Sequence, residues 1–189
     1  MTFTIAVAEN NFFIFTGGPG AGKTTVLAAL KDRGYLTEDE VARDIIQHQV
    51  IMGGNAIHTG DKAAFCQLML AASITSYKKN LSIIETVFFD RGIPGLVGYS
   101  KVASGFVTDD VKEAVQLYRY NQHVFIFPPW EQIYQNDTER MQDFTEARDT
   151  YESVKQAHLD CGYTLIEVPK VSVNERVNFI VAEIERLSV

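Results

Sequence analysis

The chain has 189 residues, of which 46% are hydrophobic and 22% are charged, so it has the length and composition of a globular protein with one hydrophobic core. Its net charge of −7 without any basic run argues against nucleic-acid binding, and no apolar stretch approaches the roughly 18 residues of a membrane span. The first residues lack the features of a secretory signal, and Cys66 and Cys161 form no metal-binding motif, so we expect a cytoplasmic protein that binds no membrane.

Short apolar runs alternate along the chain with longer segments of helical periodicity, a pattern that predicts a parallel β-sheet covered by α-helices. The predicted strands are 12–15, 35–37, a third that ends at 87–89, 123–127 and 164–168. The predicted helices are 23–31, 39–52, 61–80, 108–118, 142–160 and 174–187. We treat residues 1–10 as an N-terminal extension without an assigned role and residues 11–189 as a single domain.

The segment between the first strand and the first helix matches the pattern GxxxxGK[ST] at every fixed position. Its residues are Gly17, Gly18, Pro19, Gly20, Ala21, Gly22, Lys23, Thr24 and Thr25. Glycines let the backbone curl so that its N–H groups point inward at the positive end of a helix, which forms an anion site. Lys23 is then placed to contact the β- and γ-phosphates of a nucleotide, and the Thr24 hydroxyl to bind Mg²⁺. No guanine-reading Asn-Lys-x-Asp occurs in the chain, so we expect ATP rather than GTP.

Asp90 and Arg91 follow the third apolar strand, where ligands bind in open α/β sheets. A carboxylate at this place holds Mg²⁺ or accepts a proton from an attacking hydroxyl, and the Arg91 guanidinium suits a phosphate or carboxylate. The alternative is that the two residues form a surface turn pair. Glu85 is the competing carboxylate if the strand ends earlier than we place it.

Two further groups are candidates for the acceptor pocket and for the transferring phosphoryl group. Glu40 and Arg43 follow the second strand, where they would receive a hydroxyl proton and bind an anion; the alternative is an ordinary acidic helix start. Arg140 and Arg148 lie in a polar, lid-like segment near 128–160, from which arginines neutralise the charge that develops during transfer. The alternative for this pair is two exposed arginines on an acidic helix.

The motifs TGGPGAGKTT, EDEVARDII, FFDRGIPGLVGY and FIFPPWEQIYQNDTERMQDFTEARDTY, taken in order, resemble the small bacterial AAA-domain predicted ATPases. These are P-loop proteins related in fold to nucleoside and nucleotide kinases and to the ribosylnicotinamide kinase domain. The resemblance implies a three-layer α/β P-loop NTPase fold with a five-stranded parallel sheet in the order 2-3-1-4-5. It makes Asp90-Arg91-Gly92 the catalytic strand end and Arg140 and Arg148 the lid. One departure is Gly95, where we expect an acidic residue.

Together these features predict a phosphotransferase that uses ATP and Mg²⁺ and acts on a small, nucleoside-like or other hydroxyl acceptor. Lys23, Asp90, Arg91, Glu40, Arg140 and Arg148 are the predicted catalytic residues. Thr24 and Asp90 are the predicted metal ligands, and Glu40, Arg43 and Arg91 the predicted acceptor contacts. The alternative is a regulatory ATPase or nucleotide-dependent switch that acts through a protein partner.

Overall fold

A five-stranded parallel sheet forms the centre of the structure, a computed structural model that describes residues 11–134 and 143–187. The strands are β1 (Phe12–Gly17), β2 (Leu36–Glu38), β3 (Val87–Asp90), β4 (His123–Phe127) and β5 (Thr164–Glu167). Their order across the sheet is β2-β3-β1-β4-β5, and all the pairings are parallel. The predicted fold and strand order are therefore confirmed.

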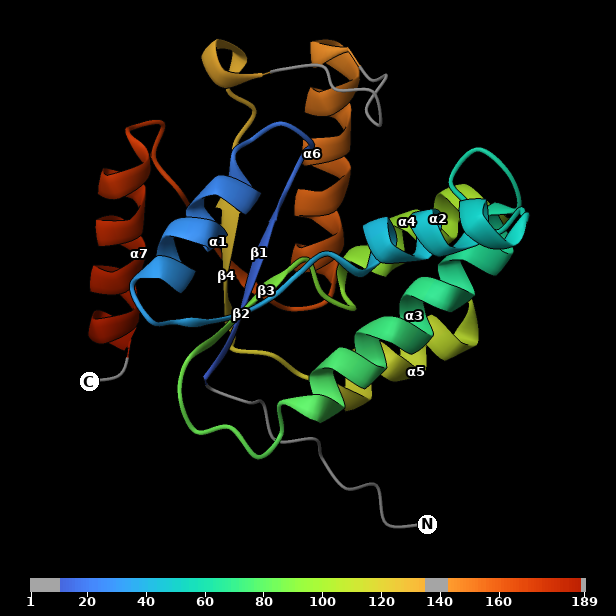
Figure 1. Cartoon of the computed structure of the whole chain (residues 1–189), viewed down its shortest axis with the longest axis horizontal. Helices are drawn as coiled ribbons and strands as arrows, with labels where there is room; N and C mark the ends of the chain where they lie inside the picture. The colour runs from blue at the N-terminus through green and yellow to red at the C-terminus, as the bar shows by residue number, and fades with distance from the viewer. Residues whose placement is uncertain (1–10, 135–142, 188–189) are drawn as a thin grey trace.

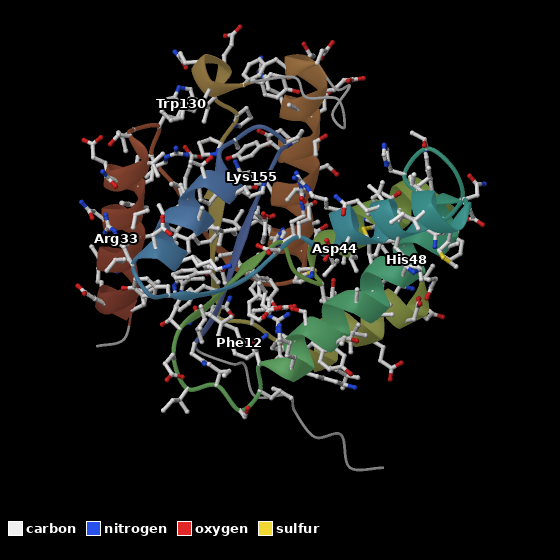
Figure 2. All side chains as sticks on the ribbon, in the orientation of Figure 1. Phe12, Arg33, Asp44, His48, Trp130 and Lys155 are labelled. Atoms are coloured by element: carbon white, nitrogen blue, oxygen red, sulfur yellow. The ribbon has the colours of Figure 1, made fainter. Side chains whose placement is uncertain are left out.

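Helices cover both faces of the sheet (Figure 1). Helices α1 (Lys23–Asp32) and α7 (Val173–Leu187) lie on one face, where Arg33, labelled in Figure 2, follows α1. Its Nη1 donates to Asn178 Oδ1 of α7 at 2.7 Å. The other face carries α3 (Lys62–Lys79), α4 (Gly95–Ser104), α5 (Asp109–Leu117) and α6 (Phe144–Asp160). Helix α2 (Val41–Met52) packs on α3, and a short 3₁₀ helix, η1 (Glu131–Ile133), follows β4.

The alternation of side chains along β1 explains why the sheet carries two cores. Phe12 and Ile14 belong to the cluster under α3–α6, whereas Phe13 and Phe15 belong to the cluster under α1 and α7. All four side chains are buried, as expected for a central parallel strand with helices on both sides. None of the helices in the described ranges is long and apolar enough to cross a membrane.

The register of the sheet brings the candidate residues to one edge. In β1, Phe15 pairs with Asp90 of β3, and Gly17 pairs with Phe127 of β4. The glycine loop and Asp90 therefore leave neighbouring strands at their carboxyl ends, as predicted. Glu85 precedes β3, is exposed, and lies toward the opposite end of that strand, which removes it as the alternative carboxylate.

The predicted elements match the structure within a few residues, with one omission. Helix α4 was not predicted, because its glycines and the preceding Pro94 give a weak helical signal; Pro94 is its N-cap residue and makes no side-chain capping bond. Burial of Leu96 and Val97 in the core stabilises it instead. Residues 1–10 and Arg140 lie outside the described residues.

His158 is a fully buried histidine of α6, with 0% of its surface exposed. Its Nδ1 lies 2.8 Å from the Val154 carbonyl oxygen, and its ring meets Tyr163 edge to face. Burial lowers the pKa of His158 from 6.5 to about 4, so the ring is neutral in the folded protein at pH 7. The residue is therefore part of the packed interior of α6 rather than of the cavity.

We expect this histidine to make stability depend on pH. The pKa of His158 is about 4 in the folded chain and 6.5 in the unfolded chain. The contribution of the neutral ring to the free energy of unfolding is therefore complete above pH 6.5 and is lost as the pH falls toward 4. The free energy of unfolding should decrease by about 3 kcal/mol over that range through His158 alone. Urea unfolding of the wild type and of His158→Gln at several pH values measures this, with His48→Gln, on exposed His48 (Figure 2), as the control. Equal pH slopes for wild type and His158→Gln would contradict it.

Candidate active site

The glycine loop is closely surrounded, because a Cβ at Gly17, Gly18, Gly20 or Gly22 would lie less than 3.0 Å from a neighbouring atom. Gly17 has φ 127°, and a Cβ there would collide with the Phe127 carbonyl oxygen. Gly22, directly before α1, has φ 82°, and a Cβ there would lie 2.6 Å from a guanidinium nitrogen of Arg176. Gly17 therefore requires glycine for conformation and for space, whereas Gly22 requires it for conformation, because the end of the Arg176 side chain can shift. The loop is a tight cradle at the N-terminus of a helix, the geometry that binds phosphate.

Lys23 is held against this cradle. Its side chain is buried, and Nζ donates to the carbonyl oxygen of Gly18 at 2.9 Å and to that of Gly17 at 3.3 Å. The ammonium group thus already lies beside the loop, where phosphate oxygens would replace the two carbonyl oxygens as its partners. Thr24 and Thr25 follow in the first turn of α1, and both are exposed.

Asp90 and Arg91 form a sharp turn at the end of β3. Asp90 is 7% exposed, and the Arg91 backbone nitrogen still donates to the Phe15 carbonyl oxygen at 2.9 Å. Arg91 has φ 65°, a left-handed conformation that is uncommon for a residue with a side chain and that occurs preferentially at functional sites. The turn holds the carboxylate and the guanidinium, side by side in the sequence, at the edge of the sheet.

Glu40 joins Arg91 across the site. It is the N-cap residue of α2, and its Oε1 lies 2.6 Å from Arg91 Nε. The Glu40 carboxylate raises the pKa of Arg91, and the Asp90 carboxylate adds to this effect. The guanidinium is therefore charged and oriented at all ordinary pH values.

A cavity of about 540 Å³ opens where these elements meet. Glu40, Asp90 and Arg91 line it together with Thr16 and Pro19, from the end of β1 and the glycine loop. Its remaining wall comes from α2, α3, α4 and α6. The glycine loop thus borders a partly open pocket of the size that takes a small organic molecule.

The donor set fits magnesium bound together with a nucleotide. Within the described ranges no cluster of three or more His, Cys, Asp or Glu side chains is placed to hold a metal ion by itself. Mg²⁺ does not need such a cage, because it keeps several waters and shares phosphate oxygens with one or two protein oxygens. The Thr24 hydroxyl and the Asp90 carboxylate are oxygen donors of the required kind.

A comparison with protein families places this site in a known group. Residues 12–176 match an AAA-domain family over most of the chain. The chain belongs to this AAA-domain family. The resemblance inferred from the motifs is thereby confirmed, and a comparison with curated proteins gives no match.

Solved structures that resemble the AAA-domain chain are kinases and a NadR protein. A deoxyadenosine kinase from M. mycoides has 15% identity and a TM-score of 0.62, with 93% of this chain and 99% of that chain covered. A thymidylate kinase from Ehrlichia chaffeensis has 15% identity and a TM-score of 0.57, with coverages of 93% and 98%. A NadR protein in complex with NR has 12% identity and a TM-score of 0.70. The match covers 94% of this chain and 51% of that chain. At these identities the likeness establishes the fold alone.

The fold of the AAA-domain chain does not bring every predicted residue to the cavity. Arg43 is exposed on α2 and does not line the cavity, because Val41, Ala42, Ile45 and Ile46 occupy the packed face of that helix. Arg148 is exposed on α6 and lines a second hollow together with Lys170. Helix α6 itself packs against the glycine loop, since a Cβ on Gly18 would lie 2.7 Å from the Ala147 carbonyl oxygen.

The sequence analysis missed Arg176, which lies directly against the glycine loop. Its Nη1 donates to the Ala21 carbonyl oxygen at 3.4 Å, and its guanidinium carbon is 5.4 Å from the centre of the Trp130 ring. The side chain is buried, and burial lowers its pKa. The one available signal was its place in the first turn of the last helix, where the helix dipole disfavours a cation.

Proposed function

We propose that this AAA-domain protein is a phosphotransferase that uses Mg-ATP to phosphorylate a hydroxyl group of a small molecule. The observation that carries the proposal is the position of Asp90, which lies at the end of β3 beside the phosphate cradle and also lines the cavity. A switch or motor protein needs the cradle but has no need of a small-molecule pocket beside it. An acceptor in this cavity would have its hydroxyl next to the end of a nucleotide in the cradle.

The loop amides and Lys23 would bind the β- and γ-phosphates, and Thr24 and Asp90 the magnesium ion. When bound, Mg-ATP supplies the phosphoryl group and the metal charge that its transfer needs. Asp90 would accept the proton of the acceptor hydroxyl while the acceptor oxygen bonds to the γ-phosphorus and the bond between that phosphorus and the departing ADP breaks. Glu40 is already occupied by Arg91 at 2.6 Å, so we assign the proton to Asp90 and the orientation of Arg91 to Glu40.

Arg91 is the residue that we assign to the developing charge on the transferred group. Its guanidinium is oriented before any ligand arrives, because the contact with Glu40 and the turn at φ 65° determine its position. For Arg148 a role in transfer would require its side chain to turn from the second hollow toward the cavity, which α6 already lines through the adjacent Asp149. Arg140 remains a proposed lid residue on the strength of the sequence.

ADP release tests the proposal. The purified chain is incubated with Mg-ATP alone and with a panel of nucleosides, nucleotides, sugars and cofactor precursors. We expect at least one acceptor to raise the rate of ADP release about 100-fold or more above the acceptor-free rate, because an aligned hydroxyl replaces water at the γ-phosphorus. Slow hydrolysis that no acceptor changes, but that a protein partner alters, would contradict the kinase and favour a nucleotide-dependent switch.

A further inference from the structure

The charges around the cavity are strongly unbalanced. Four carboxylates line it: Asp39, Glu40, Asp90 and Asp149. They come from the β2–α2 junction, the end of β3 and helix α6. Among the described residues that line the cavity, the basic side chains are Arg91 and His58. The wall is therefore acidic even before the negative charge of a nucleotide is added.

The Arg91 guanidinium does not neutralise the acidic wall enough to favour a phosphate group on the acceptor. Its Nε is 2.6 Å from Glu40, so that the pair contributes little net charge to the wall. If Asp90 binds magnesium, Asp39 and Asp149 remain as carboxylates facing the acceptor. A phosphorylated acceptor would meet these carboxylates as well as the triphosphate. Both carboxylates are exposed to solvent, which weakens the repulsion, so each of them disfavours a phosphate modestly.

The rest of the wall is apolar and aromatic. The Phe65 and Tyr99 rings meet edge to face, with their centres 5.7 Å apart, and Met69 and Leu96 lie on the same wall. Such surfaces suit a flat ring, which gains contact area at little cost in conformational entropy. Gly95, where the family resemblance predicts an acidic residue, also lines the cavity. A Cβ at this position would meet no atom within 4 Å, so the space that an acidic side chain would fill is open.

Tyr99 provides a polar group in this apolar part. Its hydroxyl is buried, and it has no hydrogen-bond partner among the described residues. Burial raises the pKa of Tyr99 to about 12, so the phenol keeps its proton at neutral pH and remains a donor. An unpaired buried hydroxyl lowers stability, and a ligand atom that accepts its hydrogen bond would remove that cost.

From these observations we infer that the acceptor is a flat-ringed alcohol that carries no phosphate, uncharged or cationic, with a polar ring atom that accepts a hydrogen bond from Tyr99. The inference rests on the proposed phosphoryl transfer and specifies its substrate class. Nucleosides and ring-bearing vitamin alcohols belong to this class, whereas nucleoside monophosphates do not. The Asp39 and Asp149 carboxylates act as the selectivity filter against phosphate.

Matched pairs of compounds test the inference. Ribo- and deoxyribonucleosides, pyridoxine and thiamine are each compared with their monophosphates, both for binding to the purified chain without nucleotide and for ADP release with Mg-ATP. We expect the unphosphorylated member of at least one pair to bind and to raise ADP release, and its monophosphate to bind about 10-fold more weakly. A monophosphate that binds as well or better overturns the inference, as does a lack of binding in every pair.

A charge reversal shows whether the acidic wall causes this preference. Asp149→Lys should reduce the discrimination against the monophosphate about 3- to 10-fold, because one carboxylate is replaced by a cation. Asp160→Lys, at the exposed end of the same helix and away from the cavity, is the matched control and should leave the preference unchanged. Equal preferences in wild type and Asp149→Lys would overturn the role of the wall.

Tyr99→Phe tests the hydrogen bond separately. We expect the affinity for the preferred acceptor to fall about 3- to 10-fold, while the melting temperature of the free protein is unchanged or higher, because an unpaired buried hydroxyl is removed. A lower melting temperature with unchanged affinity would show a purely structural role for Tyr99 and overturn this part.

Failure of the inference and failure of the proposed function give different results. If a monophosphate is the better acceptor, phosphoryl transfer stands and only the substrate class is wrong. If compounds bind but none changes ADP release, phosphoryl transfer itself is wrong.

Discussion

In Lys23→Ala, ATP should no longer stabilise the protein appreciably against heat. For the wild type, a nucleotide concentration of about 100 times Kd adds about 2.7 kcal/mol of stability, which raises Tm by roughly 5 to 10 °C in a chain of this size. Loss of the ammonium group removes charge-assisted hydrogen bonds to phosphate and should weaken binding about 100-fold. The residual increase in Tm is then about 1 to 2 °C at the same nucleotide concentration.

Thermal unfolding with and without Mg-ATP measures the increase in Tm caused by the nucleotide. Because each variant is compared with itself, a change in the stability of the free variant does not affect this increase. Lys31→Ala is the matched control, because Lys31 is an exposed lysine near the other end of the same helix. Its increment should equal that of the wild type. An undiminished increment in Lys23→Ala would show that the nucleotide binds elsewhere.

Asp90→Asn should separate nucleotide binding from turnover. Asparagine keeps the shape of the side chain, but it accepts no proton and binds magnesium weakly. We expect acceptor-dependent ADP release to fall at least about 100-fold, the size of effect typical of a lost general base or charge-stabilising group. The thermal stabilisation by ATP measured without Mg²⁺ should remain, since Lys23 and the loop amides hold the phosphates.

The control for this variant is Asp109→Asn, at an exposed aspartate in the first turn of α5. That substitution should leave ADP release unchanged. Full activity of Asp90→Asn would refute the assignment of the base and of the metal ligand together, and Glu85 would not replace it, since Glu85 precedes β3 and is exposed.

The parts of the site that depend on neighbouring residues were predicted well. The glycine loop is a local motif: its conformation depends on consecutive residues and on the helix that follows them. Asp90 was also predicted, because a carboxylate directly after an apolar strand lies at the carboxyl end of the sheet in any parallel α/β fold. Strand boundaries and helix ends followed from apolar periodicity and from glycines such as Gly34, with φ 91° after α1.

The parts that depend on packing were predicted less well. Whether Arg43 or Glu40 reaches the cavity depends on which face of α2 packs on the core, and Arg43 lies on the exposed face. Helix α4 has weak local signals and forms because its apolar side chains are buried. Arg176 is about 150 residues from the glycine loop that it contacts, so no local pattern connects the two.

The sequence by itself therefore determined that this AAA-domain chain has a glycine loop with Lys23 and Thr24 at the start of a helix, a carboxylate at Asp90 at the end of a strand, and a parallel sheet that supports both. The tertiary structure decided the rest: that Glu40 binds Arg91, that Asp39 and Asp149 face the same cavity as Tyr99, and that Arg148 does not. The physical reason is the range of the interactions. Turns and helix starts follow from adjacent residues, whereas a pocket is lined by side chains from separate elements whose positions are set by the packing of the whole core.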